Sequence, residues 1–290
     1  MSIYGVCDNK CLKELNSIFG NPNLLVNGSF QVWQRGTMFD ETVTERYSAD
    51  RWVRRNLTSE VSKTKNGLMM RNLASNSNCG IGQPLENIES LLGKTVTLSV
   101  KVKSVVGSWK LCMAKINNGA HVGGYEEAPC FIDSVGTHKI TFTLPSVKEY
   151  KYYSIQLYST ADINARIEVE YIKMEEGSVA TKNVKQAYGV ELVECQRFYN
   201  KFPVIYSARR KAYESSASKT LVPALPFTDM RAEPTLKVGS ITSLSGTNTG
   251  VNVSSYRIVG NKYLTMITLS GDISEHDVFL NEVELNAEIY

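Results

Sequence analysis

Between residues 23 and 176 the chain alternates hydrophobic and polar positions with a period of two. The alternation is clearest in residues 95–103, 139–144, 154–158 and 166–172. Because side chains alternate across a strand, this period indicates strands with one buried face. Turn pairs such as Asn66-Gly67 separate the strands, of which there are roughly nine or ten. We therefore expect a mainly β fold, a jelly-roll or galactose-binding-like β-sandwich over residues 23–180.

The pattern changes after residue 180. Hydrophobic residues now recur at helical spacing, with charged residues on the other faces; they are Tyr188, Leu192, Cys195, Phe198 and Tyr199. This periodicity predicts a connecting amphipathic helix within residues 181–202. A helix of roughly 17 residues would be about 25 Å long, and Pro203 would end it.

The two flanking regions are shorter. Residues 1–22 are expected to form a strand and a helix that cannot fold alone, and that serve either as a capping element or as an attachment segment to a larger assembly. Residues 203–290 predict a small C-terminal β domain, because strand patterns return at 218–226, 236–238, 256–259, 263–269 and 283–289. Residues 240–255 are rich in serine, threonine, asparagine and glycine and predict a long loop.

Composition excludes several classes of protein. The 290 residues carry 32 basic and 29 acidic side chains, a balance that does not favour a nucleic-acid partner. No stretch of about 18 apolar residues predicts a transmembrane helix, and the first residues lack the pattern of a signal peptide. Six cysteines and three histidines are scattered apart from Cys7 and Cys11, so we expect free thiols and no metal site.

Several blocks of sequence, in order along the chain, resemble one protein family. They are residues 3–11, 23–36, 47–52, 92–99, 171–181, 188–199 and 225–235, and the most distinctive is Asn23-Leu24-Leu25-Val26-Asn27-Gly28-Ser29-Phe30. These blocks resemble phage tail fibre and receptor-binding proteins that contain a carbohydrate-binding-module-like β-sandwich. The leader at residues 3–11 is similar to that of clostridial prophage members.

The resemblance implies a homotrimer in the tail of a virion, made in the cytoplasm of the host bacterium. Its target would be a bacterial surface polysaccharide, and the N-terminus would contact other tail or baseplate proteins. Three copies of the helix would bury Leu192, Cys195 and Phe198 or Tyr199 around an axis. The alternative is that the helix lies across its own sandwich. Linking three weak sites would raise avidity by ~10²–10⁴.

A sugar site needs an aromatic face together with amide or carboxylate groups that bond hydroxyls. Trp33 and Trp52 lie in the family blocks and are expected in the core. Four residues close to predicted turns form the candidate carbohydrate site: Trp109, Asn118, His121 and Tyr125. The alternatives are surface aromatics without a ligand, or a site in the C-terminal domain at Arg209, Arg210 and Tyr213 or at residues 245–255.

Structural calcium is an alternative that similar sandwiches suggest, and its carboxylate ligand would be Glu175 or Glu176. No catalytic residue is predicted, because the chain lacks the usual nucleophile, phosphate-loop and metalloprotease motifs. The function that we expect is therefore non-enzymatic attachment to a glycan. The alternatives are a structural tail or baseplate protein with the sandwich as a spacer, and, third, a glycan depolymerase.

Overall fold

The computed structural model places a β-sandwich and a second, smaller β unit along the chain. It describes residues 20–74, 79–117, 125–159, 163–208, 218–221, 223, 225–243, 249–272 and 277–288. The chain divides into two compact units between Glu191 and Leu192, a point inside the helix α2 (Tyr188–Gln196). The predicted attachment segment, residues 1–22, lies outside the described residues except for its last three.

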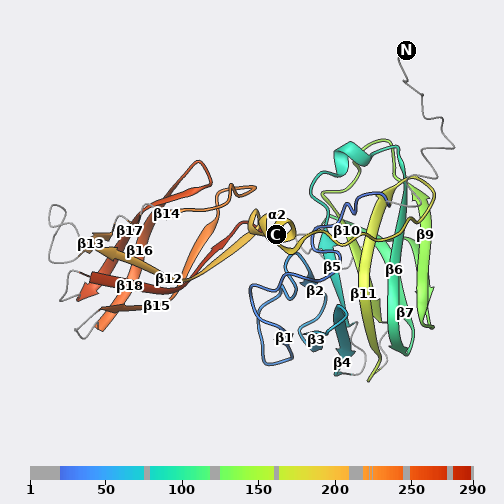
Figure 1. The fold of residues 1–290 in the computed structure, drawn as a ribbon, viewed down its shortest axis with the longest axis horizontal. Helices are drawn as coiled ribbons and strands as arrows, with labels where there is room; N and C mark the ends of the chain where they lie inside the picture. The colour runs from blue at the N-terminus through green and yellow to red at the C-terminus, as the bar shows by residue number, and fades with distance from the viewer. Residues whose placement is uncertain are drawn as a thin grey trace, which may run out of the picture. The chain divides into compact units, whose positions relative to one another are not determined.

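The N-terminal unit is a sandwich of two antiparallel sheets (Figure 1). The first sheet has the strand order β1-β3-β4-β11-β6-β9: Met38–Phe39, Ser59–Lys63, Leu68–Asn72, Arg166–Glu176, Thr95–Val106 and Gly136–Thr143. The second has the order β2-β5-β10-β7-β8: Val53–Arg54, Gly80–Pro84, Tyr152–Ser159, Trp109–Ile116 and Tyr125–Ile132. A short 3-10 helix, η1 (Ile88–Leu91), precedes β6. The predicted fold class is confirmed.

The core of this unit lies between the two sheets. Alternate residues of the central strands fill it, for example Val96, Leu98 and Val100 of β6 with Ile155 and Leu157 of β10. The period-two pattern therefore located these strands correctly from the sequence. Their inward side chains are buried, as the alternation requires.

The connecting helix is shorter than predicted. α2 has nine residues, and residues 181–187 before it are not helical. Thr181 and Lys182 are instead held against β11, because the Lys173 ammonium donates to both of their carbonyl oxygens. At the other end, Tyr199 pairs with Asn286 in a strand. Tertiary bonds thus override the helical periodicity.

The C-terminal unit packs two small sheets around its own core. One has the order β12-β18-β15: Tyr199–Ala208, Asp277–Asn286 and Thr235–Ser243. In the other, β17 (Tyr263–Asp272) pairs with β13 (Ser218–Leu221), β14 (Leu225–Pro226) and β16 (Thr249–Val259). The long loop expected at 240–255 is wrong, since β15 and β16 occupy most of it.

The sequence predicted that Pro203 ends the helix, and this is wrong. Pro203 lies inside β12. β12 is an edge strand of its sheet, where a missing N–H is tolerated. The three strands of this sheet change their alternation at one level: Pro203 in β12, Glu282 in β18 and Gly239 in β15 are skipped by the pairing. Glu282 has a φ of 51°, a left-handed conformation. Consequently Val283 and Leu280, three residues apart, both face the core.

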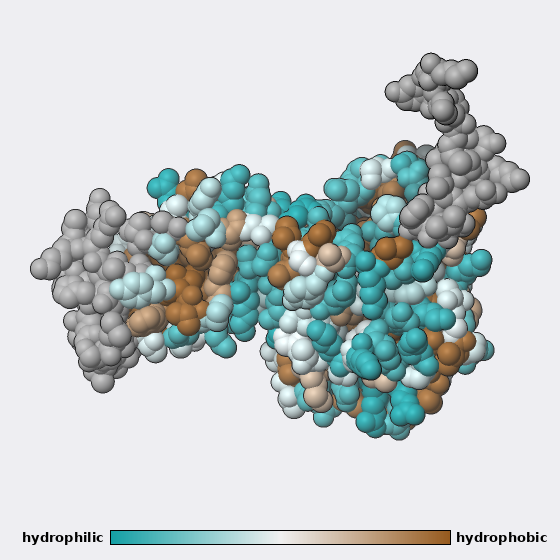
Figure 2. Space-filling view, in the orientation of Figure 1, coloured by the Kyte–Doolittle hydropathy of each residue, from teal (hydrophilic) through white to brown (hydrophobic). Residues whose placement is uncertain are grey.

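Hydrophobic residues are exposed on both units. Figure 2 shows a continuous brown area on the C-terminal unit in this view. Large exposed apolar side chains of that unit include Val204, Tyr206 and Tyr263. Within the described ranges, no helix combines the length and hydrophobicity that crossing a membrane requires.

Candidate functional site

The first family block folds into a buried clamp at the start of the sandwich. The Asn23 amide donates to the Ile172 carbonyl at 2.9 Å and its Oδ1 accepts from the Met174 N–H at 3.0 Å. Gly28 lies so close to β11 that a Cβ would stand 2.5 Å from the Ile172 oxygen. These contacts fix residues 23–28 along β11, so the block has a structural role in the sandwich.

The second half of the clamp is centred on Asn27. This residue has a φ of 55°, and its side chain bonds the backbone of Val32 and the Asp50 carbonyl. Its carbonyl accepts from the Trp52 indole at 3.0 Å, and its N–H donates to the Glu191 carboxylate. Trp52 is fully buried, as the sequence predicted. The residues that carry the family resemblance are therefore mostly structural.

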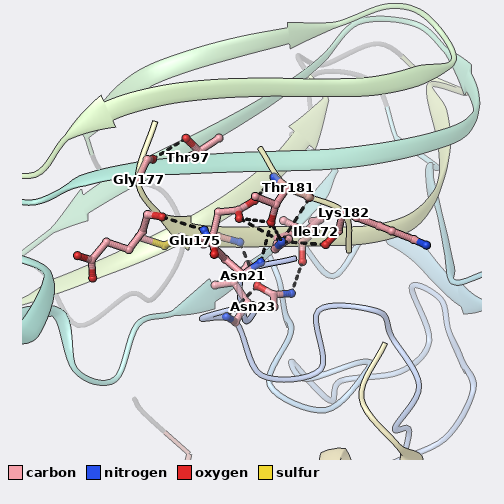
Figure 3. A network of polar contacts seen from close by, with 12 residues as sticks. Asn21, Asn23, Thr97, Ile172, Glu175, Gly177, Thr181 and Lys182 are labelled. Atoms are coloured by element: carbon pink, nitrogen blue, oxygen red, sulfur yellow. Dashed lines mark hydrogen bonds and ion pairs between the residues drawn. The ribbon is translucent and has the colours of Figure 1, made fainter. Parts of the chain in front are cut away.

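A buried ion pair holds the segment that leaves the sandwich (Figure 3). Lys173 and Glu175 alternate with the core residues Ile172 and Met174 on β11, so both point to the outer face of the six-stranded sheet. Figure 3 labels Glu175 and Thr181 in this network. Their charged groups are 3.2 Å apart and both side chains are 0% exposed. Thr181 donates its N–H to Glu175 at 2.8 Å and its hydroxyl at 2.5 Å. Residues 177–182 are thereby fixed over the sheet.

A pocket of about 280 Å³ adjoins this network. Residues 20–29 and 183–191 line it, and Asn183, Ser29 and Glu191 supply polar groups. The Asn183 amide donates to the Ser29 hydroxyl at 3.1 Å, and Glu191 already accepts from the clamp. The volume is at the lower limit of ligand pockets, roughly 300–1,000 Å³. Because its polar groups serve the clamp, the pocket is a weaker candidate for a ligand site than the outer face of the five-stranded sheet, described below.

The predicted carbohydrate site is not assembled as expected. Trp109, predicted to belong to the carbohydrate site, is 0% exposed and packs in the core beside Leu111 and Met113. Its position on β7 gives it the inward orientation, so this prediction is wrong. Asn118 and His121 lie outside the described residues, as do Arg209, Arg210 and Tyr213. Tyr125 begins β8, but its side chain is not described.

The residues predicted for a trimer interface have other environments. Cys195, Phe198 and Tyr199 are buried within the single chain, and only the first lies on α2. Tyr188 is exposed, and Leu192 is half-buried. The single chain itself covers most of the predicted stripe, which makes these residues unsuitable as contacts between copies.

The two carboxylates considered for calcium are also engaged. Glu175 serves the buried ion pair, and Glu176 accepts from Lys94 at 2.9 Å. The described part of the chain contains no cluster of three or more acidic, histidine or cysteine side chains suited to a metal. Burial raises the pKa of the Cys79 thiol to about 12, which keeps it protonated.

A row of aromatic and cationic side chains crosses the outer face of the five-stranded sheet. Tyr158 of β10 pairs with Lys110 of β7, which pairs with Phe131 of β8. On the other side Tyr158 pairs with Gly80, whose carbonyl accepts from the Arg55 N–H at 2.7 Å. Four strand spacings separate the ends, about 19 Å.

Cation–π contacts organise this row. The Arg55 guanidinium lies 3.8 Å from the Tyr158 centroid, and Lys110 lies 5.4 Å from the Phe131 centroid. Arg55 also donates to the buried amide of Gln156. Tyr158 is covered, whereas Phe131 is 62% exposed. The row therefore presents one exposed aromatic ring and two half-buried cationic side chains.

The sequence analysis did not identify these residues. The row takes its members from three strands and from Arg55, the residue after β2, and only the pairing register brings them together. One local signal existed, because Ser154, Gln156 and Tyr158 occupy the outward positions of a recognised strand. Because these three side chains are polar, the sequence indicated that their face of the strand is not part of the core.

Comparisons with known proteins concern the fold. No family model and no curated protein match the chain, whereas 28 solved chains do. A tandem pair of family 22 carbohydrate-binding modules from Paenibacillus barcinonensis has 12% identity and a TM-score of 0.34, with coverage of 93% of this chain and 90% of that one. The C-terminal family 22 module of a Clostridium thermocellum xylanase has 12% identity and a TM-score of 0.35, with coverage of 56% and 99%.

A third match is a longer chain, the N-terminal family 22 and GH10 modules of that Clostridium thermocellum xylanase. It has 14% identity and a TM-score of 0.34, and the alignment covers 46% of this chain and only 27% of the xylanase chain. At these identities and TM-scores the matches assign this chain no family, ligand or site.

Proposed function

We propose that this chain is a non-enzymatic receptor-binding protein that attaches to a bacterial cell-surface glycan. The observation that carries the proposal is the row of Arg55, Tyr158, Lys110 and Phe131 on the outer face of the five-stranded sheet. An exposed aromatic ring beside hydrogen-bond donors has the chemistry that a pyranose requires, since one face of the sugar is apolar and its rim is hydroxylated.

Each group in the row has a role in this proposal. The Phe131 ring packs against the apolar face of one sugar unit. The Lys110 ammonium and the Arg55 guanidinium donate to hydroxyl or carboxylate oxygens of neighbouring units. Tyr158 contacts both cations, Arg55 and Lys110, and Gln156 accepts a hydrogen bond from the Arg55 guanidinium. Tyr158 and Gln156 therefore position the cations. Such a shallow site binds weakly by itself.

Weak binding becomes firm attachment when several sites act together. A homotrimer would raise avidity by ~10²–10⁴ without new contacts. Val190 and Val193 are exposed three residues apart on α2 and offer contacts in place of the buried stripe. The resemblance of the sequence blocks supports a place in a phage tail, with residues 1–22 binding other tail or baseplate proteins.

The second candidate function is a structural tail or baseplate protein in which the sandwich is a spacer. One observation favours it: Asn27, Trp52 and Trp109 are all buried and serve folding. A glycan depolymerase is third, and release of reducing sugars from host cell wall would establish it.

A glycan array of bacterial surface polysaccharides tests the proposal with the full chain. The wild type should bind a subset of them, and Phe131→Ala should lose most of that binding. Ile163→Ala is the matched control, because it removes another exposed apolar side chain from the same unit. Binding of no glycan by the wild type, or equal binding by Phe131→Ala, would instead support the spacer.

A further inference from the structure

The outer face of the sheet β12-β18-β15 has three chemically different rows. Lys201, Glu284 and Lys237 pair across the strands and form a charged row. At the level where the alternation changes, Glu282 adds an exposed carboxylate 4.0 Å from the Lys201 ammonium. Beyond that level the next rows are uncharged. The first contains Val204, Asn281 and Ser240, and the second contains Tyr206, Phe279 and Thr242. The change in alternation therefore brings neutral residues to this end of the face.

An aromatic pair forms the apolar part of this neutral area. Tyr206 and Phe279 lie opposite each other on β12 and β18, with ring centroids 5.3 Å apart and planes tilted by 45°. Tyr206 is 53% exposed and the neighbouring Val204 is 51% exposed. The pair offers an apolar surface about the width of two strands.

Beside the rings is an ordered set of hydrogen-bonding groups. The Asn281 amide nitrogen donates to Ser240 Oγ at 3.2 Å and to Thr242 Oγ1 at 3.1 Å. Both hydroxyls accept these bonds and neither is shown donating to a described residue, so their own hydrogens can donate to a ligand. The Asn281 Oδ1 atom accepts no bond from the described residues. The face thus presents two hydroxyl donors and one carbonyl acceptor beside the rings.

We propose that this face of the C-terminal unit is a second binding site, for an uncharged pyranose unit of a polysaccharide. The tilted rings receive the apolar face of the sugar, and Ser240, Thr242 and Asn281 bond its hydroxyls. The site differs from the row in the N-terminal unit because it holds no cation, so it selects neutral sugars. One chain then carries two unlike glycan sites, and the second does not depend on the first.

A second copy of the chain is a less suitable occupant. Half of a tyrosine and half of a valine expose on the order of 200 Å² of apolar surface. A stable interface buries about 800 Å² per partner, so this neutral area is too small to hold two copies together. A single sugar ring needs no more than the aromatic pair and its hydrogen-bonding groups.

Saturation-transfer difference NMR on the full chain tests the site. The probes are N-acetylglucosamine, methyl β-galactopyranoside and methyl α-glucopyranoside, and the background is Phe131→Ala, so that the first site does not contribute. At least one probe should receive saturation in this background. Adding Tyr206→Ala should weaken its binding about tenfold, on the scale of a stacked aromatic pair. Adding Tyr263→Ala, a partly exposed tyrosine on β17, should not.

Three results would overturn the inference. The first is no saturation of any probe in the Phe131→Ala background. The second is binding that persists after Tyr206→Ala and Asn281→Ala. The third is sedimentation showing copies that associate in the wild type and separate in Tyr206→Ala, which would make the face an interface between chains. A failed glycan array for Phe131→Ala leaves this site unaffected, so the two proposals fail separately.

Discussion

Replacing Lys173 by methionine should unfold the N-terminal unit far more easily. The Lys173 ammonium bonds the Thr181 hydroxyl at 2.7 Å, the Lys182 carbonyl at 3.1 Å and the Glu175 carboxylate at 3.2 Å. Methionine keeps the apolar stem and leaves Glu175 charged and buried without its cation. Breaking such a pair costs about 3–5 kcal/mol. We expect the free energy of unfolding to fall by this amount.

Urea unfolding followed by tryptophan fluorescence measures the change. Trp33, Trp52 and Trp109 all lie in the N-terminal unit, so the signal reports that unit alone. Loss of the network should also release the segment that leaves the sandwich, and trypsin should then cleave faster after the exposed residues Lys182 and Lys185. The double variant Lys173→Met/Glu175→Leu should recover part of the loss, because it removes the uncompensated charge.

A matched control is available on the neighbouring residue of β11. Glu176 and Lys94 are 2.9 Å apart, but their side chains are 55% and 45% exposed. Lys94→Met should therefore change stability by less than about 1 kcal/mol. If Lys173→Met destabilised the unit no more than Lys94→Met does, and left tryptic cleavage unchanged, burial of the pair would not control this segment and the reasoning would be wrong.

Three further predictions concern other positions. Gly28→Ala should cost more than about 2 kcal/mol in urea unfolding, because its Cβ would stand 2.1 Å from the Asn23 amide and 2.5 Å from the Ile172 oxygen; an unchanged midpoint would contradict the clamp. Glu282→Gly should stabilise the C-terminal unit by about 1 kcal/mol by relieving its left-handed backbone, and a calorimetric Tm that falls would refute this. Burial raises the pKa of Cys79 from 9.0 to about 12, so the contribution of this thiol to stability should be constant below pH 9 and fall from pH 9 towards 12; Cys79→Ala should make the decline in unfolding free energy above pH 9 less steep, and an equally steep decline would count against it.

The fold could be predicted where the controlling interactions are local. Alternation in residues 95–103 and 166–172 depends only on which residues are apolar, and the strands β6 and β11 contain these segments. The same reasoning could have corrected the Trp109 prediction. Trp109, Leu111 and Met113 alternate with Lys110 and Cys112, which already places the tryptophan with the core residues.

Other features depend on distant residues and could not be predicted. The seven residues before α2 read as helical, but the ammonium and carboxylate of Lys173 and Glu175 hold Thr181 in a different conformation. The aromatic and cationic row requires the register of β10 against β7 and of β7 against β8. No period along the chain encodes that register, so Phe131 could not be distinguished from other exposed aromatics.

The chain enters and leaves the sandwich at neighbouring points. The backbone N–H of Asn21 donates to the Thr181 hydroxyl at 2.8 Å, although 160 positions separate the two residues. Segments whose ends lie close together can be inserted or exchanged with little disturbance to what surrounds them. Residues 24–176 thus form a cassette: recombination at its paired ends could install a different recognition module while the flanking parts of the protein stay as they are.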